Sequence, residues 1–148
     1  MGANLRTSIY VDGFNLYYGA LKNTQYKWLN ILSLCQKIID PKHVIGKIKY
    51  FTARVIPNQR DINIHTRQNL YLRALNTVPN TEIILGNFQT HTVNRPLANP
   101  LEVLIANPMN HLKTPKIIHF ADVLITNEKG SDVNLATNLL VDGMSDLY

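Results

Sequence analysis

The feature that most constrains this chain is a short apolar run, Ile9-Tyr10-Val11, which stops at Asp12 and is followed at once by Gly13. β-Branched and aromatic residues without polar alternation predict a strand that is buried on both faces, as in a parallel sheet. Gly13 ends the strand, and apolar residues then recur at helical spacing. The pattern predicts a strand, a tight turn and a helix, with Asp12 at the carboxyl end of the strand, where open α/β sheets bind ligands.

Asp12 has two interpretations at this stage. Asp-Gly between apolar runs is also a common hairpin signal, and an aspartate at a strand end often only caps the next helix. Asn15 follows within roughly one helical turn and can aim its amide at the place to which Asp12 points. A carboxylate and an amide that converge at a strand tip suit a hard cation or a phosphate. Both the structural and the ligand-binding interpretation remain open on these two residues.

Length and composition predict one domain covering residues 1–148. A chain of 148 residues can bury one proper core, and 45% hydrophobic with 17% charged residues are globular values. Fifteen Lys and Arg against ten Asp and Glu give a net charge of +5, which favours an anionic partner. The only cysteine, Cys35, lies in an apolar run, and no apolar run approaches the length of a membrane span. These features predict a cytoplasmic protein.

Apolar periodicity alternates between strand and helix along the rest of the chain. The predicted elements are a helix at 28–39, a strand at 44–56, a helix at 59–76, and strands at 81–93 and 116–126. Residues 96–116 hold four prolines and little periodicity, which predicts an ordered loop or flap. A last helix is predicted at 131–144. The order indicates an α/β fold built on βαβαβ units.

The last predicted helix carries an acidic residue on its apolar side. At about 100° per residue, Leu135 and Leu139 belong to one apolar arc, and Asp132 projects into the middle of it. A carboxylate facing the core is costly unless it is capped, paired or bound to a metal. The alternative is that Ser131 or Asp132 is simply the N-cap after Gly130.

Two further acidic residues flank this position. Asp142 lies about 15 Å from Asp132 along the helix axis, so the two cannot serve one small site, and we assign Asp142 to structure. Glu128 precedes the helix closely enough to approach Asp132, although neighbours in sequence often have no common role. Whether Glu128 belongs to a site with Asp132 remains open.

Three motifs stand in order along the chain: VDGFNLYY at 11–18, GNFQTH at 86–91 and EKGSDVNLA at 128–136. Together they resemble the NYN domain of the LabA-like bacterial proteins, which belong to the PIN-like nuclease superfamily. The resemblance covers nearly the whole chain. It implies a three-layer PIN-like α/β fold, with a mostly parallel central sheet, helices on both faces and acidic residues at the strand tips.

The resemblance also implies a metal-dependent endoribonuclease that hydrolyses RNA phosphodiesters. In that family the acidic cluster holds Mg²⁺ or Mn²⁺. Asp12 and Asp132 match acidic positions of the family, Asn15 matches the polar one, and Glu128 is a further candidate metal ligand. Metal ions at these carboxylates would activate water and neutralise phosphate oxygens, while Asn15 would orient ligand or water.

Single-stranded RNA, the expected partner, would be bound through basic side chains that contact its phosphates. The candidates for this role are Lys47, Lys49, Arg54, Arg60, Arg67, Arg95, Lys113 and Lys129.

The sequence departs from the family after the last helix. There the family continues with a strand that carries a Ser-(Gly or Asn)-Asp-x-Asp segment, whereas this sequence stops at Tyr148. We therefore expect a truncated domain, weak or absent cleavage, and an open edge at residues 9–11 that pairs with another copy or a partner. The alternatives are a non-catalytic RNA-binding or regulatory module of the same fold, a mononucleotide-binding or phosphatase-like domain, against which the lack of a Gly-rich loop counts, and an assembly domain.

Overall fold

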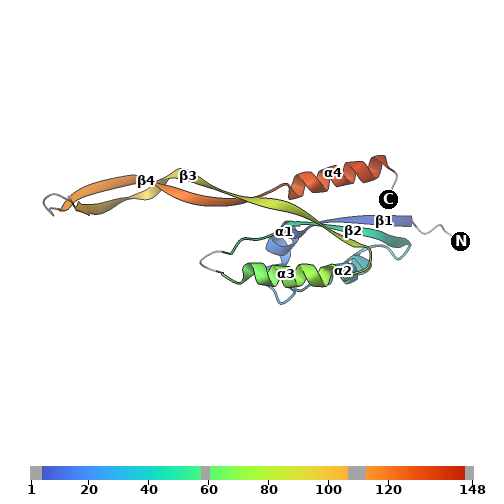
Figure 1. The fold of residues 1–148 in the computed structure, drawn as a ribbon. Coiled ribbons are helices and arrows are strands. Elements are labelled where there is room, and N and C mark those ends of the chain that lie inside the picture. Colours follow the sequence, from blue (N-terminus) through green and yellow to red (C-terminus); the bar gives the residue numbers. More distant parts are fainter. Residues whose placement is uncertain (1–4, 58–60, 107–112, 146–148) are drawn as a thin grey trace. The chain divides into compact units, whose positions relative to one another are not determined.

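The computed structural model of the chain describes residues 5–57, 61–106 and 113–145. The described residues form a mixed α/β structure with a four-stranded sheet, four α-helices and one π-helix. By contacts the chain divides into two compact units, the first made of residues 1–88 and 128–148 and the second of residues 89–127. The elements in chain order are β1 (Leu5–Asp12), α1 (Gly13–Leu16), the π-helix η1 (Tyr17–Leu21), α2 (Ile31–Ile38), β2 (His43–Ala53), α3 (Ile64–Leu75), β3 (Thr81–Ala106), β4 (Lys113–Lys129) and α4 (Ser131–Met144) (Figure 1).

The strand order is β1-β2-β3-β4, and β2 pairs in parallel with both β1 and β3. The predicted strand, helix, strand, helix, strand succession is therefore observed. β4 returns antiparallel to β3: the Thr90 hydroxyl lies 2.9 Å from that of Thr126, and the Asn94 amide donates to Asp122 at 2.7 Å (Figure 1). The sheet is thus partly antiparallel, which the prediction of a mostly parallel sheet did not include.

β2 supplies the centre of the core in the first unit because alternate residues of a strand point to opposite faces. Ile48 and Tyr50 are buried together with side chains from α2 and α3. The members of this cluster are Ile31, Cys35, Ile48, Tyr50, Leu72 and Leu75. α2 begins later than the prediction of residue 28 because the side chain of Asn30 caps it, accepting from the Ser33 backbone N–H at 3.0 Å.

The prediction of a loop or flap at 96–116 is wrong over the described residues. β3 continues to Ala106 and β4 begins at Lys113, so most of the segment is a two-stranded ribbon. In such a ribbon each strand has one edge without a partner, where the missing N–H of a proline costs no ladder hydrogen bond. Proline content therefore misled the prediction at Pro96, Pro100 and Pro115, while Pro108 lies outside the described residues.

α4 has the predicted bounds but buries a different face. Of the apolar arc expected in the core, Leu135 is partly buried and Leu139 is 42% exposed, whereas Ser131 and Asp142 are buried. Asp132, expected on the core-facing stripe, is exposed in the first turn of the helix. The prediction assumed that apolar residues decide which face packs, and here polar residues decide it.

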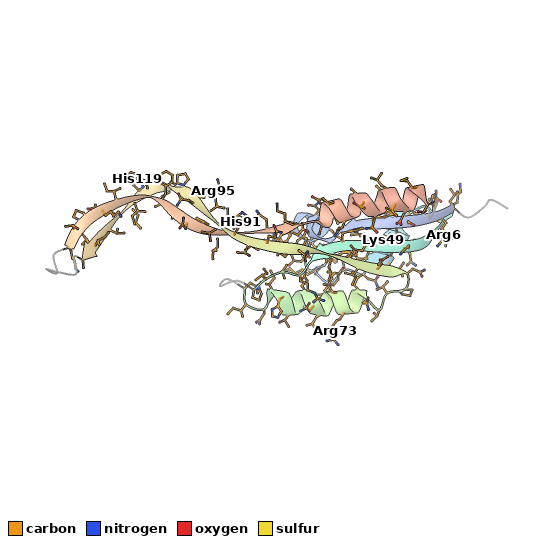
Figure 2. All side chains as sticks on the ribbon, turned by 45° about the horizontal axis from the view of Figure 1, so that its top comes forward. Arg6, Lys49, Arg73, His91, Arg95 and His119 are labelled. Atoms are coloured by element: carbon orange, nitrogen blue, oxygen red, sulfur yellow. The ribbon has the colours of Figure 1, made fainter. Side chains whose placement is uncertain are left out.

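The buried face of α4 carries a polar network, which we call the Lys49 network, formed by Tyr10, Lys49, Asn138 and Asp142. The ammonium of Lys49, a residue labelled in Figure 2, lies 2.5 Å from the carboxylate of Asp142 and donates to Asn138 at 2.8 Å. The Tyr10 hydroxyl donates to the same carboxylate at 2.6 Å. Hydrogen bonds from Lys49 and then Tyr10 hold the pKa of Asp142 below its usual value. A buried charge is tolerable when it is paired and hydrogen-bonded in this way, so the network fixes α4 on β1 and β2.

Gly86, on β3, packs against the end of β4 and the start of α4. A Cβ atom at this position would lie 2.8 Å from the Glu128 carboxylate and 2.9 Å from the Lys129 carbonyl oxygen. We expect Gly86→Ala to destabilise the chain by about 1–3 kcal/mol, since backbone cannot move aside cheaply. Urea unfolding measures the loss. Gly46→Ala is the control, because its Cβ meets only the flexible Arg6 side chain; equal losses at both glycines would contradict the expectation.

Candidate functional site

A cavity of about 120 Å³ lies in the first unit, lined by residues from the turn after β1, from η1, from the segment before α2, from β2 and from α3. Six of its lining residues are aromatic. We call it the aromatic pocket, after the side chains of Phe14, Tyr17, Tyr18, Trp28, Tyr50 and Tyr71. None of these was singled out as a site residue by sequence reasoning, although four aromatic residues fall within 17–28. Aromatic residues near a strand end are usual core residues, so the signal was ambiguous.

Three rings of the pocket, those of Trp28, Tyr50 and Tyr71, are arranged edge to face. Tyr71 lies at the centre, with its ring centroid 6.2 Å from that of Trp28 and 6.2 Å from that of Tyr50. Its hydroxyl donates to the Leu29 carbonyl at 3.0 Å, which fixes the ring between the two neighbours. Such aromatic pairs stabilise a fold by more than the burial of their apolar surface alone provides. The pocket wall is therefore preorganised on β2 and α3.

Gly13 allows the turn after β1 to approach this wall. A Cβ atom on Gly13 would lie 2.5–2.6 Å from the ring and hydroxyl of Tyr50, closer than real atoms come. The glycine that sequence reasoning assigned to ending the strand therefore also makes room for a buried tyrosine.

The polar part of the pocket wall consists of Lys27, Arg67 and Gln68, with Thr52 beside them. Gln68 accepts from the Val55 N–H at 2.9 Å and donates to the Ala53 carbonyl at 2.8 Å, so its side chain is fixed to the end of β2. The guanidinium of Arg67 donates to Asp61 in an ion pair, which raises the pKa of Arg67. Lys27 and Arg67 thus give the pocket wall a positive side.

Burial changes the acidity of the tyrosines in the pocket. Desolvation, with smaller contributions from Tyr71 and Asp12, raises the pKa of Tyr50 well above its usual range. Desolvation alone raises the pKa of Tyr71 to about 12. Both phenols therefore remain neutral hydrogen-bond donors at physiological pH.

These shifts predict a loss of stability at alkaline pH. The unfolded phenol of Tyr71 ionises near 10.0 and the folded one near 12, so the folded chain holds a proton that the unfolded chain releases. The contribution of Tyr71 to stability should be constant below pH 10 and fall as the pH rises toward 12. Urea unfolding across this range tests it, and Tyr71→Phe should make the fall less steep. A free energy of unfolding that stays constant up to pH 12 would contradict the assignment.

The structure brings Asp12 and Asn15 together, as sequence reasoning expected, but in a capping arrangement. Asp12 is the N-cap of α1: one carboxylate oxygen accepts from the Asn15 backbone N–H at 2.9 Å and the other from its side-chain amide at 2.6 Å. Of the two interpretations left open for Asp12, these contacts match the structural one.

Glu128 also has a structural contact. Its carboxylate accepts from the backbone N–H of Ser131 at 2.9 Å, so it caps α4 from two residues before the N-cap Gly130. Within the described ranges, no group of three or more His, Cys, Asp or Glu side chains is arranged to hold a metal ion. Asp12, Asp132 and Glu128 therefore do not form the metal-binding cluster of three carboxylates that was predicted.

The cations predicted to bind RNA have varied surroundings. Lys49 is buried in the Lys49 network, so its ammonium is withdrawn from solvent. Lys47 pairs with Glu82 at 2.7 Å, and Arg54 donates to Asn69 at 2.8 Å. The remaining positions are Arg67 at the aromatic pocket, Arg95 and Lys113 in the second unit, Lys129 exposed at the end of β4, and Arg60, which lies outside the described residues.

A curated protein is similar to this chain over almost the whole of the chain's length. It is 32% identical over 160 aligned residues to the 6-hydroxy-3-succinoylpyridine 3-monooxygenase HspA of Pseudomonas putida (strain DSM 28022 / S16), and the alignment covers 95% of this chain and 48% of that protein. The chain thus spans about half the length of the curated relative that it matches. No family model matches the chain, and no solved structure matches it. In the part of the chain that the structure describes, no helix is long and apolar enough to cross a membrane.

These findings correct the functional prediction. The relative is a monooxygenase, so the predicted metal-dependent ribonuclease, a hydrolase, is wrong, and the alternative of an RNA-binding module of that fold gains no support. Mg²⁺ or Mn²⁺ as cofactor is wrong for the same reason and because the described residues hold no metal-binding group. The resemblance to NYN domains, the open edge as a pairing surface and the cytoplasmic location stay predictions.

Proposed function

We propose that the chain is the substrate-binding domain of a monooxygenase that acts on a single-ring aromatic compound, bound in the aromatic pocket. The observation that carries this proposal is the match to a pyridine monooxygenase over 95% of the chain. The pocket supports it independently, because six aromatic side chains converge on one cavity. Such concave, mostly apolar sites with few polar groups are typical of small-molecule binding.

The size of the cavity suits one aromatic ring. An apolar cavity of roughly 150 Å³ takes up benzene, and the aromatic pocket measures about 120 Å³ and is open to solvent on one side. A flat ring entering it would contact Trp28 and Tyr71 in offset or edge-to-face geometry. The neutral hydroxyl of Tyr50 is available there as a donor to a ring substituent.

A monooxygenase inserts one atom of dioxygen into its substrate and reduces the other to water with two electrons, which a reduced flavin or nicotinamide supplies. The described residues do not fit such a dinucleotide. The first strand–helix turn reads Asp-Gly-Phe-Asn at 12–15 instead of a Gly-rich phosphate loop, and the carboxylate of Asp12 would repel a pyrophosphate. We therefore assign to these residues the binding and orientation of the substrate, and no redox step.

Substrate binding measured by isothermal titration calorimetry tests the proposal, with 6-hydroxy-3-succinoylpyridine titrated into the chain. We expect saturable one-to-one binding, and strongly weakened binding in Trp28→Ala, which removes one wall of the pocket. The matched control is Tyr26→Ala, which removes an exposed aromatic residue that does not line the pocket. No binding by the unsubstituted chain, or equal weakening in both variants, would refute the proposal.

We also propose that the first unit has a three-layer PIN-like fold. The three sequence motifs support this, as do the parallel strands β1, β2 and β3 with α4 packed on β1 and β2. A fold does not fix a function, so this proposal is compatible with oxygenase chemistry. An experimental structure of the chain is the test, and a sheet covered by helices on one face only would exclude it.

A further inference from the structure

We infer that Arg67 recognises an anionic group on the ring compound that the aromatic pocket binds, and that Asp61 occupies Arg67 until this ligand arrives. The ligand class is therefore a single-ring aromatic acid. The inference rests on the proposed function for the location of the ligand. It goes beyond that function by naming the residue that binds the ligand's charged group and the sign of that charge.

The position of Arg67 favours this role. It lies in the first turns of α3, where its backbone N–H donates to the Asn63 carbonyl at 3.1 Å. The next residue, Gln68, is fixed to the end of β2 by its two hydrogen bonds. The base of the Arg67 side chain is thus held at the pocket, while the side chain as a whole is about half exposed, at 52%. It can exchange one carboxylate partner for another without any movement of the helix.

The ion pair with Asp61 is suited to exchange. The side chains of both residues are partly exposed, and exposed ion pairs stabilise a fold only weakly. Asp61 also contributes to raising the pKa of Tyr18, which places its carboxylate near the aromatic wall. A ligand carboxylate that replaces Asp61 would meet the same planar guanidinium fork, which is shaped for two parallel hydrogen bonds.

The charges of the pocket wall agree with an acidic ligand. The described residues that line the pocket include two cations, Lys27 and Arg67, and no carboxylate. The net charge of the whole chain is +5. An apolar ring beside a cationic edge fits a ligand with one flat apolar part and one anionic part, which the name of the relative's substrate, a succinoylpyridine, also describes.

Ligand binding measured by fluorescence tests the inference, because the single tryptophan, Trp28, lines the pocket. Two pairs of probes are compared: 6-hydroxy-3-succinoylpyridine with its terminal amide, and phenylacetate with phenylacetamide. We expect each acid to bind more tightly than its amide, and Arg67→Gln to weaken acid binding about tenfold while leaving amide binding unchanged. Asp61→Asn, which frees Arg67, should strengthen acid binding.

Arg73→Gln is the matched control. Arg73 lies on the same helix, is exposed and does not line the pocket, so the net charge changes equally while the proposed contact stays (Figure 2). Equal weakening by Arg73→Gln and Arg67→Gln, or an acid preference that survives Arg67→Gln, would overturn the inference. The two proposals fail separately: acid binding that depends on Arg67 but survives Trp28→Ala refutes only the proposed function, and binding that depends on Trp28 but not on Arg67 refutes only the inference.

Discussion

Lys49→Met should lower the free energy of unfolding by about 3–5 kcal/mol, the largest loss that we expect from a single substitution in this chain. The Lys49 side chain is buried, and its ammonium is the charge that compensates the buried carboxylate of Asp142. Without it, Asp142 keeps only the hydroxyl of Tyr10 among the partners described above. Urea unfolding followed by circular dichroism measures the loss.

Two further variants identify the cause of this loss. Lys47→Met removes a lysine from the same strand whose pair with Glu82 is about half exposed, and it should cost less than about 1 kcal/mol. Lys49→Met combined with Asp142→Leu removes both buried charges and should recover most of the stability. If the double variant is no more stable than Lys49→Met alone, the loss does not come from an unpaired charge.

Gly13→Ala should cost about 1–3 kcal/mol and also weaken ligand binding at the aromatic pocket. The added methyl group would overlap the ring of Tyr50, which is buried and packed against Tyr71. Relief requires movement of that ring, and the same ring forms part of the pocket wall. Unfolding and the Trp28 fluorescence titration measure the two effects on one sample.

Gly19→Ala is the control for this substitution, since a Cβ atom at Gly19 meets no other atom within 4 Å. A helix usually gains up to about 1 kcal/mol from replacing an exposed glycine by alanine, so this variant should be neutral or more stable. If the Gly13→Ala chain is as stable as the unsubstituted one and binds the ligand equally well, then neither stability nor binding depends on the close approach of the turn to Tyr50.

Local sequence pattern predicted most of the helices and strands, but it did not predict which face of a helix is buried or the hairpin of β3 and β4. The succession of strands and helices was predictable because each element has its own period and its own cap or breaker, as at Asn30. The orientation of α4 was not, because Asp142 finds Lys49 and Tyr10 far away in the sequence. The hairpin of β3 and β4 was missed because an isolated ribbon accepts prolines that a central strand rejects.

The candidate site was also predictable only in part. Asp12 and Asn15 do meet, but their mutual hydrogen bonds form a helix cap, and a strand-tip carboxylate by itself does not distinguish a cap from a ligand site. The aromatic pocket draws on the turn after β1, the segment before α2, β2 and α3. Its residues come together only through the parallel pairing of β1 with β2 and the packing of α3, which no single stretch of sequence encodes.

The most direct test of the central claim is an NMR measurement of where the ligand binds. In a sample of the chain with 6-hydroxy-3-succinoylpyridine, we predict intermolecular nuclear Overhauser effects between the pyridine ring protons and the ring protons of Trp28 and Tyr71, which form adjacent parts of the pocket wall. Cross-peaks confined to residues outside the aromatic pocket, or no cross-peaks at saturating ligand, would contradict the account.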